Sequence, residues 1–106
     1  MLSPNDIFVS EVTVAELEYG NRCCRRYEEN KWMVDRFLSS VNIVPFSDAI
    51  HLYAEERYRL RMLGQCIEDF DLLIGCTAVS DNLVMVTNNA KHYSRIKDIR
   101  IENWIV

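Results

Sequence analysis

The chain has 106 residues, of which 49% are hydrophobic and 26% are charged, a composition typical of one ordinary globular domain. A disordered chain is excluded, because this apolar content can offset the entropy that is lost on ordering. The net charge of −4 excludes a basic surface over the whole chain, and no apolar run approaches the length of a membrane span.

The first part of the chain alternates a short apolar run with helical patterns. Residues 6–10 are short, apolar and β-branched, and they predict a strand. Thr13-Val14-Ala15-Glu16 has the spacing of a capping box, which predicts a helix running towards Arg26. Gly20 weakens or breaks that helix. Residues 28–41 carry apolar side chains at helical spacing and predict a second helix.

The middle of the chain continues this alternation. Residues 41–45 predict a second short strand, and Ser47-Asp48 can cap a third helix that Gly64 ends. The length and the Ala and Leu content of residues 70–79 favour a buried helix over a strand. Residues 83–87 form the clearest strand, because a continuous apolar run suits a parallel sheet covered on both faces.

The last elements complete an α/β pattern. Residues 88–96 predict a short helix, and residues 100–102 predict a final strand. Strands that alternate with helices indicate a sandwich of helices around a mostly parallel sheet. We therefore expect one domain over residues 1–106, with the strand at 83–86 inside the sheet. The expected strands start near Ile7, Asn42, Leu83 and Arg100.

Three polar side chains lie at element ends, where sites form in open α/β sheets. Glu16 lies one turn into a helix that follows a strand, and Asp71 opens an apolar helix. Asn89 follows the strand at 83–87. Each has a purely structural alternative: a helix cap for Glu16, a favourable charge at a helix N-terminus for Asp71, and an Asx turn for Asn89.

Two clusters of arginines allow two interpretations. They consist of Arg22, Arg25 and Arg26, and of Arg57, Arg59 and Arg61. Such clusters are either solvated helix faces or contacts for phosphate or an acidic partner.

The cysteines and histidines do not form a motif for zinc. Cys23, Cys24, Cys66 and Cys76 contain no C-x-x-C pair, and His51 and His92 stand alone in the sequence. A zinc site is therefore disfavoured. We expect reduced cysteines and, with no signal-peptide pattern at the start, a cytoplasmic protein without a membrane segment.

Four blocks carry a resemblance to a known family, in the right order and at plausible spacing. They are Ser10–Gly20, Asp69–Gly75, Leu83–Asn89 followed by His92-Tyr93 and Ile96, and Ile101–Trp104. Together they resemble the second to fourth conserved blocks and the closing strand of VapC-like PIN domains. These are the ribonuclease toxins of type II toxin–antitoxin pairs. The resemblance covers essentially the whole chain.

The resemblance implies a metal site and its residues. It makes Glu16 and Asp71 metal-site acids and matches Asn89 to a position where the family has Asp or Asn. Asp69 is a nearby third acid for the metal, and Thr87 with Asn88 falls at the substrate side of the strand end. The implied cofactor is Mg²⁺ or Mn²⁺, and the implied reaction is attack of an activated water on an RNA phosphodiester. Hard oxygen ligands suit these ions.

The chain departs from the family pattern at its start. PIN domains open with an apolar strand that ends in a metal-binding Asp, whereas Met1–Asn5 resembles the loop before the second strand. We therefore expect the usual first, central strand and its helix to be missing, and RNA cleavage to be weak or absent. The alternative is a non-catalytic PIN remnant that binds an antitoxin or dimerises. A flavodoxin-like nucleotide binder is disfavoured, because no Gly-rich phosphate loop is present.

The expected partners are an RNA substrate, a small antitoxin protein and a second copy of the chain. Removal of a central strand would leave unpaired backbone edges, which invite pairing with another chain. We expect either a homodimer that closes the gap or direct pairing of the strands near Ile7 and Leu83.

Overall fold

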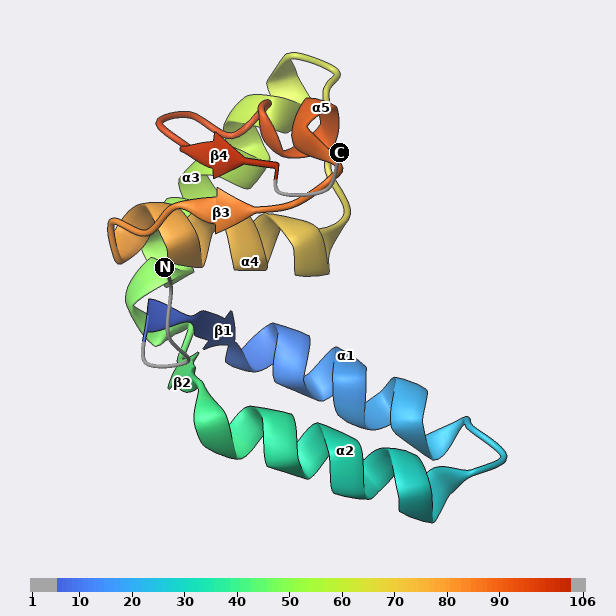
Figure 1. The fold of residues 1–106 in the computed structure, drawn as a ribbon. Helices are drawn as coiled ribbons and strands as arrows, with labels where there is room; N and C mark the ends of the chain where they lie inside the picture. The colour runs from blue at the N-terminus through green and yellow to red at the C-terminus, as the bar shows by residue number, and fades with distance from the viewer. Residues whose placement is uncertain (1–5, 104–106) are drawn as a thin grey trace. The chain divides into compact units, whose positions relative to one another are not determined.

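The computed structural model describes residues 6–103, and these form two compact units (Figure 1). The N-terminal unit extends to Pro45, and the C-terminal unit begins at Phe46. None of the helices within residues 6–103 combines the length and the apolarity that crossing a bilayer requires. The predicted contribution of Trp104 to the closing strand lies outside the described residues.

The N-terminal unit is a helical hairpin between two strands. Its elements are β1 (Phe8–Ser10), α1 (Glu11–Arg22), α2 (Tyr27–Ser40) and β2 (Asn42–Val44). The strands β1 and β2 pair in parallel, with Phe8 opposite Asn42. The helices α1 and α2 pack against each other. All four elements lie within a few residues of their predicted positions.

Helix α1 begins earlier than the sequence pattern indicates. Its N-cap is Ser10, whose Oγ accepts a hydrogen bond of 3.1 Å from the backbone N–H of Val12. The predicted capping box at Thr13 and Glu16 is therefore wrong, because the serine that ends the strand already caps the helix. Gly20 does not interrupt α1, which continues to Arg22.

The C-terminal unit holds the remaining elements. They are η2 (Ser47–Ala49), α3 (Ile50–Met62), α4 (Asp69–Ser80), β3 (Met85–Val86), α5 (Ala90–Tyr93) and β4 (Ile101–Glu102). Gly64 ends α3 as predicted, with a φ of +68° that suits glycine. The Ser47-Asp48 pair forms a 3₁₀ turn, and Ala49 takes the N-cap position of α3 without a side-chain cap.

The strands are parallel, as predicted for an α/β fold, but they are shorter than expected. β1 pairs with β2, and β3 pairs with β4. Within residues 6–103, each unit therefore holds one parallel pair of strands. The strand expected inside the sheet, β3, has two residues and one partner in the described chain. Two-stranded sheets depend on neighbouring helices for their stability.

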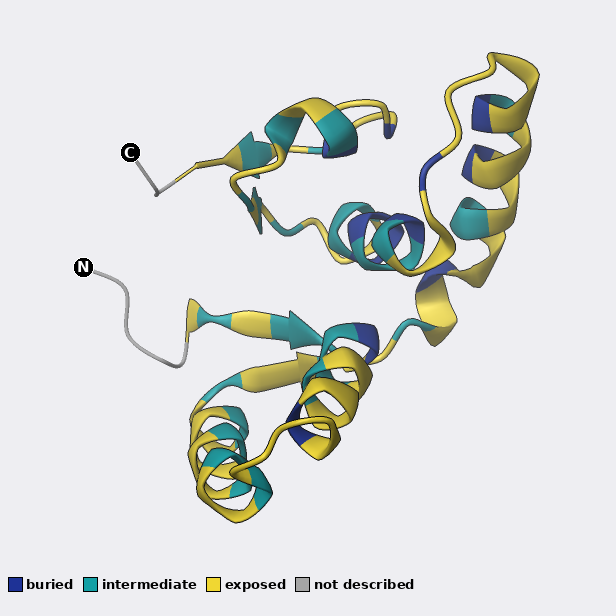
Figure 2. Ribbon diagram, turned by 90° about the vertical axis from the view of Figure 1, so that its right-hand side faces the viewer, coloured by how far each residue is buried: buried dark blue, intermediate teal, exposed yellow. Residues whose placement is uncertain are grey.

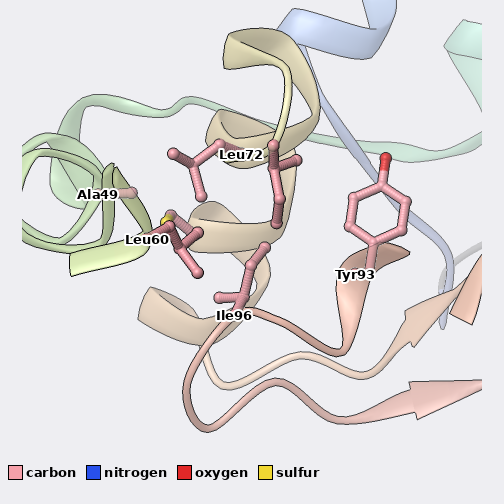
Figure 3. Close-up of a cluster of buried hydrophobic side chains, with 7 residues drawn as sticks. Ala49, Leu60, Leu72, Tyr93 and Ile96 are labelled. Carbon is pink, nitrogen blue, oxygen red and sulfur yellow. The ribbon is translucent and has the colours of Figure 1, made fainter. Parts of the chain in front are cut away.

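A hydrophobic core holds the C-terminal unit together. Leu60, Leu72, Cys76 and Ile96 are the largest fully buried side chains, and Figure 3 shows three of them, Leu60, Leu72 and Ile96, with Tyr93 in one cluster. Figure 2 shows buried positions of this unit on α3, α4 and α5 and on the segments that connect them. The predicted buried helix in residues 70–79 is therefore confirmed, and it positions Asp71 at its start.

A buried acid ties α3 to the segment after α5. The Glu56 side chain is only 5% exposed, and both of its oxygens accept hydrogen bonds of 2.8 Å from Arg59. Its Oε2 also accepts from the backbone N–H of Lys97 at 3.0 Å, while Arg59 donates to the Arg95 carbonyl at 2.8 Å. The Arg59 guanidinium lowers the pKa of Glu56, although burial opposes this shift.

Candidate functional site

Asp71 is the central residue of the candidate site in the C-terminal unit. It lies in the first turn of α4 and its side chain is 28% exposed. The Tyr93 hydroxyl donates a hydrogen bond of 3.0 Å to its Oδ1. Its Oδ2 lies 3.2 Å from Nε2 of His92. Two side chains of α5 therefore fix both carboxylate oxygens.

Asn89 lies at the start of the same short helix, α5. Its backbone carbonyl accepts the N–H groups of His92 and Tyr93 at 3.2 and 3.3 Å. Its own N–H donates to Oγ1 of Thr87 at 3.0 Å. The strand-end residues Thr87 and Asn89 thus hold the turn that presents the two partners of Asp71. Asn89 makes no side-chain cap, and Asn88 is exposed beside it.

Asp69, the third predicted acid, contacts a different element. Its Oδ1 accepts a hydrogen bond of 3.1 Å from the Tyr53 hydroxyl and lies 3.4 Å from Nε of Arg57, both on α3. Residues two apart on a helix are separated by roughly 200° around its axis. Asp69 and Asp71 therefore lie on different sides of α4, and their hydrogen bonds go to different helices.

Glu16 is exposed on α1, in the N-terminal unit. The expected convergence of Glu16 with Asp71 and Asn89 stays a prediction. Within the C-terminal unit, the structure brings Asp71 and Asn89 together through α5 and directs Asp69 towards α3.

The donor chemistry of Asp71 suits a hard divalent cation. Each carboxylate oxygen accepts one contact from α5, and a carboxylate has further lone pairs to offer. Asn89, whose backbone holds the turn beside Asp71, carries an amide group, and an amide oxygen is a ligand type that Mg²⁺ also takes. Within residues 6–103, no three His, Cys, Asp or Glu side chains are grouped to hold a metal ion. The oxygen ligands of the C-terminal unit therefore have the chemistry that such an ion prefers. Of the predicted acids in this unit, Asp71 is the one beside α5.

The sequence did not identify His92 and Tyr93 as partners of Asp71. His92 stood alone in the sequence, yet it contacts a carboxylate 21 positions earlier. Its ring also packs edge-on against Tyr93, with centroids 5.4 Å apart. The sequence feature that could have identified His92 and Tyr93 was their position just after Asn89. These two residues already formed part of the family resemblance.

The arginine clusters divide between surface contacts and structural pairs. Arg59 forms an ion pair with the buried Glu56. The interpretation of its cluster as a solvated helix face is therefore wrong for Arg59. Arg57 pairs with Asp69, and Arg26 lies 3.6 Å from Glu29. The guanidinium of Arg22 stacks over the ring of Tyr27.

All four cysteines are free in the structure. Cys23, Cys24 and Cys66 are exposed, whereas Cys76 is buried in the core. Burial raises the pKa of the Cys76 thiol to about 12. A thiol of this kind packs as a small apolar side chain and is a poor nucleophile.

Comparisons with known proteins identify the family of this chain. The family model described as PIN domain matches residues 1–99. The chain therefore belongs to the PIN domain family. It is 39% identical to Ribonuclease VapC2 of Rickettsia felis over 101 residues, which cover 94% of this chain and 75% of that protein. It is 33% identical to the tRNA(fMet)-specific endonuclease VapC of Salmonella typhimurium, covering 97% of this chain and 79% of that protein.

Solved structures give the same result. The VapBC2 structure from Rickettsia felis, bound to a DNA fragment from its promoter, matches with a TM-score of 0.88 and 37% identity. It covers 93% of this chain and 75% of that one. The VapBC-1 structure from nontypeable Haemophilus influenzae matches with a TM-score of 0.90 and 30% identity, over 98% of this chain and 78% of that one. Within the PIN family this chain is VapC-like, and the predicted α/β PIN fold is confirmed.

Proposed function

We propose that this chain is a VapC-like toxin, a metal-dependent endoribonuclease that cleaves RNA phosphodiesters. Asp71, a carboxylate fixed at a helix start by His92 and Tyr93, is the observation that carries the proposal. The likeness to relatives named Ribonuclease VapC2 and tRNA(fMet)-specific endonuclease VapC supports it.

The proposed cofactor is Mg²⁺ or Mn²⁺, held by Glu16, Asp71 and Asn89. Asp69 would join these ligands only after leaving its contacts with Tyr53 and Arg57. When bound, such an ion lowers the pKa of a water and neutralises charge that develops on the phosphate. The chain's own contribution is orientation. The Tyr93 hydroxyl and the His92 ring restrict the Asp71 carboxylate to one direction, and partners of this kind affect metal affinity by about 10–100-fold.

The proposed position of the substrate follows from the strand end. Thr87 and Asn88 lie between β3 and α5, next to the turn that presents His92 and Tyr93. An RNA backbone that reaches Asp71 would pass this turn. We therefore propose that Thr87 and Asn88 contact the substrate and do not hold the metal.

Assembly and location complete the proposal. We propose a small antitoxin protein as the partner, in a complex that contains two copies of this chain. The solved neighbours named VapBC from Rickettsia felis and Haemophilus influenzae support the antitoxin. We also propose a cytoplasmic location, because all four cysteines are free.

The test is RNA cleavage by the purified chain with and without Mg²⁺. We expect weak cleavage by this chain, which EDTA abolishes and Asp71→Asn removes. Asp81→Asn is the matched control, because Asp81 is an exposed acid at the other end of the same helix. Cleavage that survives Asp71→Asn would overturn the role of this acid.

A second candidate, the non-catalytic module, is favoured by one observation: within the C-terminal unit Asp69 turns towards α3, so Asp71 is the one predicted acid beside α5. If the chain binds an antitoxin but cleaves no RNA at any Mg²⁺ or Mn²⁺ concentration, this alternative replaces the enzyme.

A further inference from the structure

A cavity of about 530 Å³ opens between α3 and the start of α4, within the C-terminal unit. This volume falls in the usual range of small-ligand pockets. Its floor is apolar, because Leu60, Ile67 and Leu72 line it and belong to the core. Asp69 also lines it, so the cavity lies beside the turn of α4 that carries Asp71.

One side of the cavity is closed by a charge-neutral cluster. The Tyr53 hydroxyl donates to Asp69 at 3.1 Å and accepts from Arg57 at 3.0 Å. The Arg57 guanidinium also lies 3.4 Å from Asp69. Because Arg57 balances Asp69, this wall adds no net negative charge that would repel an anion.

The other side of the cavity offers a ring and a cation. Tyr58 lines it and is 65% exposed. Arg61 lies three residues further along α3, so the two side chains are neighbours on the helix surface. Within residues 6–103, the Arg61 side chain makes no hydrogen bond or ion pair. The cavity thus combines an apolar floor, an accessible aromatic face and an unpaired guanidinium.

We propose that this cavity is a nucleotide subsite for single-stranded RNA. In it, a base stacks on Tyr58 over the apolar floor, and Arg61 pairs with an adjoining phosphate. Aromatic rings beside arginines are the chemistry by which proteins hold unpaired nucleotides. An acidic peptide could pair with Arg61, but it would have no base to stack on the neighbouring ring of Tyr58. The inference rests on the proposed ribonuclease function and adds a place where the substrate binds.

The subsite acts in binding and not in the chemical step. Asp69 borders the cavity, whereas Asp71 contacts α5 on another side of α4. An RNA strand bound at Tyr58 and Arg61 would therefore have to pass the N-terminal end of α4 to reach Asp71. Loss of an interaction made equally in the ground state and the transition state raises KM and leaves kcat unchanged.

The experiment measures the affinity of the whole chain for a fluorescently labelled single-stranded RNA, by anisotropy in EDTA at about 0.15 M salt. We expect Tyr58→Ala and Arg61→Glu each to weaken binding by about tenfold, and Tyr58→Phe to keep the affinity. The matched control is Arg36→Glu, an exposed arginine in the other unit that belongs to neither arginine cluster. Circular dichroism checks that each variant is folded, which we expect because the changed side chains are exposed.

Each outcome is decisive. RNA binding that Tyr58→Ala and Arg61→Glu leave intact overturns the subsite and spares the proposed function. Equal losses for Arg61→Glu and Arg36→Glu show a general charge effect and also overturn the subsite. No RNA binding by the unmodified chain in EDTA overturns the subsite, and the cleavage assay with Mg²⁺ then tests the proposed function separately. The last outcome comes from an NMR titration. If the signals of residues 53–72 shift when an acidic, phenylalanine-containing peptide is added but not when RNA is added, the RNA subsite is rejected in favour of a protein partner.

Discussion

The most informative perturbation of stability is Glu56→Gln. Glu56 accepts three hydrogen bonds, two from Arg59 at 2.8 Å and one from the Lys97 backbone at 3.0 Å. Glutamine has the same length, but one of its two terminal atoms is an NH₂ donor. In either orientation that NH₂ faces a donor of Arg59, so at least one hydrogen bond is lost, and the charge is lost with it.

The expected cost follows from these contacts. A hydrogen bond to a charged group contributes about 1.5–3 kcal/mol, and breaking a buried ion pair costs about 3–5 kcal/mol. The Arg59 side chain is 37% exposed, so its guanidinium can turn partly to water. We therefore expect a loss of about 2–3 kcal/mol of unfolding free energy at neutral pH. This is a large part of the usual 5–15 kcal/mol.

The effect should depend on pH with a defined sign. The Arg59 guanidinium holds the pKa of Glu56 below its ordinary value, which is about 4.3 in an unfolded chain. The stabilisation is therefore complete above that ordinary value and is lost as the pH falls through the lower, folded-state pKa. The difference between Glu56→Gln and the unmodified chain should shrink in acid.

Urea unfolding followed by circular dichroism at pH 7 and at acidic pH values measures this difference. The control is Glu55→Gln, the exposed neighbour on the same helix, which should change stability by less than about 0.5 kcal/mol. A Glu56→Gln variant as stable as the control, or one whose deficit grows in acid, would refute the reasoning.

Three further changes test the packing. Gly75→Ala should cost about 1–3 kcal/mol, because the added Cβ collides with the buried side chain of Ile96; Gly20→Ala, which meets nothing within 4 Å, should instead stabilise α1. Equal thermal stabilities for these two variants would contradict the packing. Ser10→Ala should cost about 1 kcal/mol through loss of the helix cap, seen as a lower urea midpoint, and no shift would reject that cap. A thiol reagent at pH 8 should label the three exposed cysteines rapidly and Cys76 only after unfolding, with fast labelling of all four as the contrary result.

The sequence by itself predicted the elements and the family. Helical spacing of apolar residues marked α2, and the apolar run after Asp71 marked α4 as a buried helix. These features are local, since a helix face is set by residues three and four apart. The order of the motif blocks predicted a VapC-like PIN domain, which the comparisons confirm.

Only the tertiary structure decided which partners the acids have. Asp71 meets Tyr93 across 22 positions, and Glu56 meets the Lys97 backbone across 41. In the sequence Glu56 is one more acid on a charged helix, with no feature that separates it from exposed Glu55. Burial of a charge depends on which distant segment packs over it, and a local pattern carries no information about that segment. The contact that fixes Asp71 and the contact that buries Glu56 therefore emerge only when α3, α4 and the segments after β3 pack together.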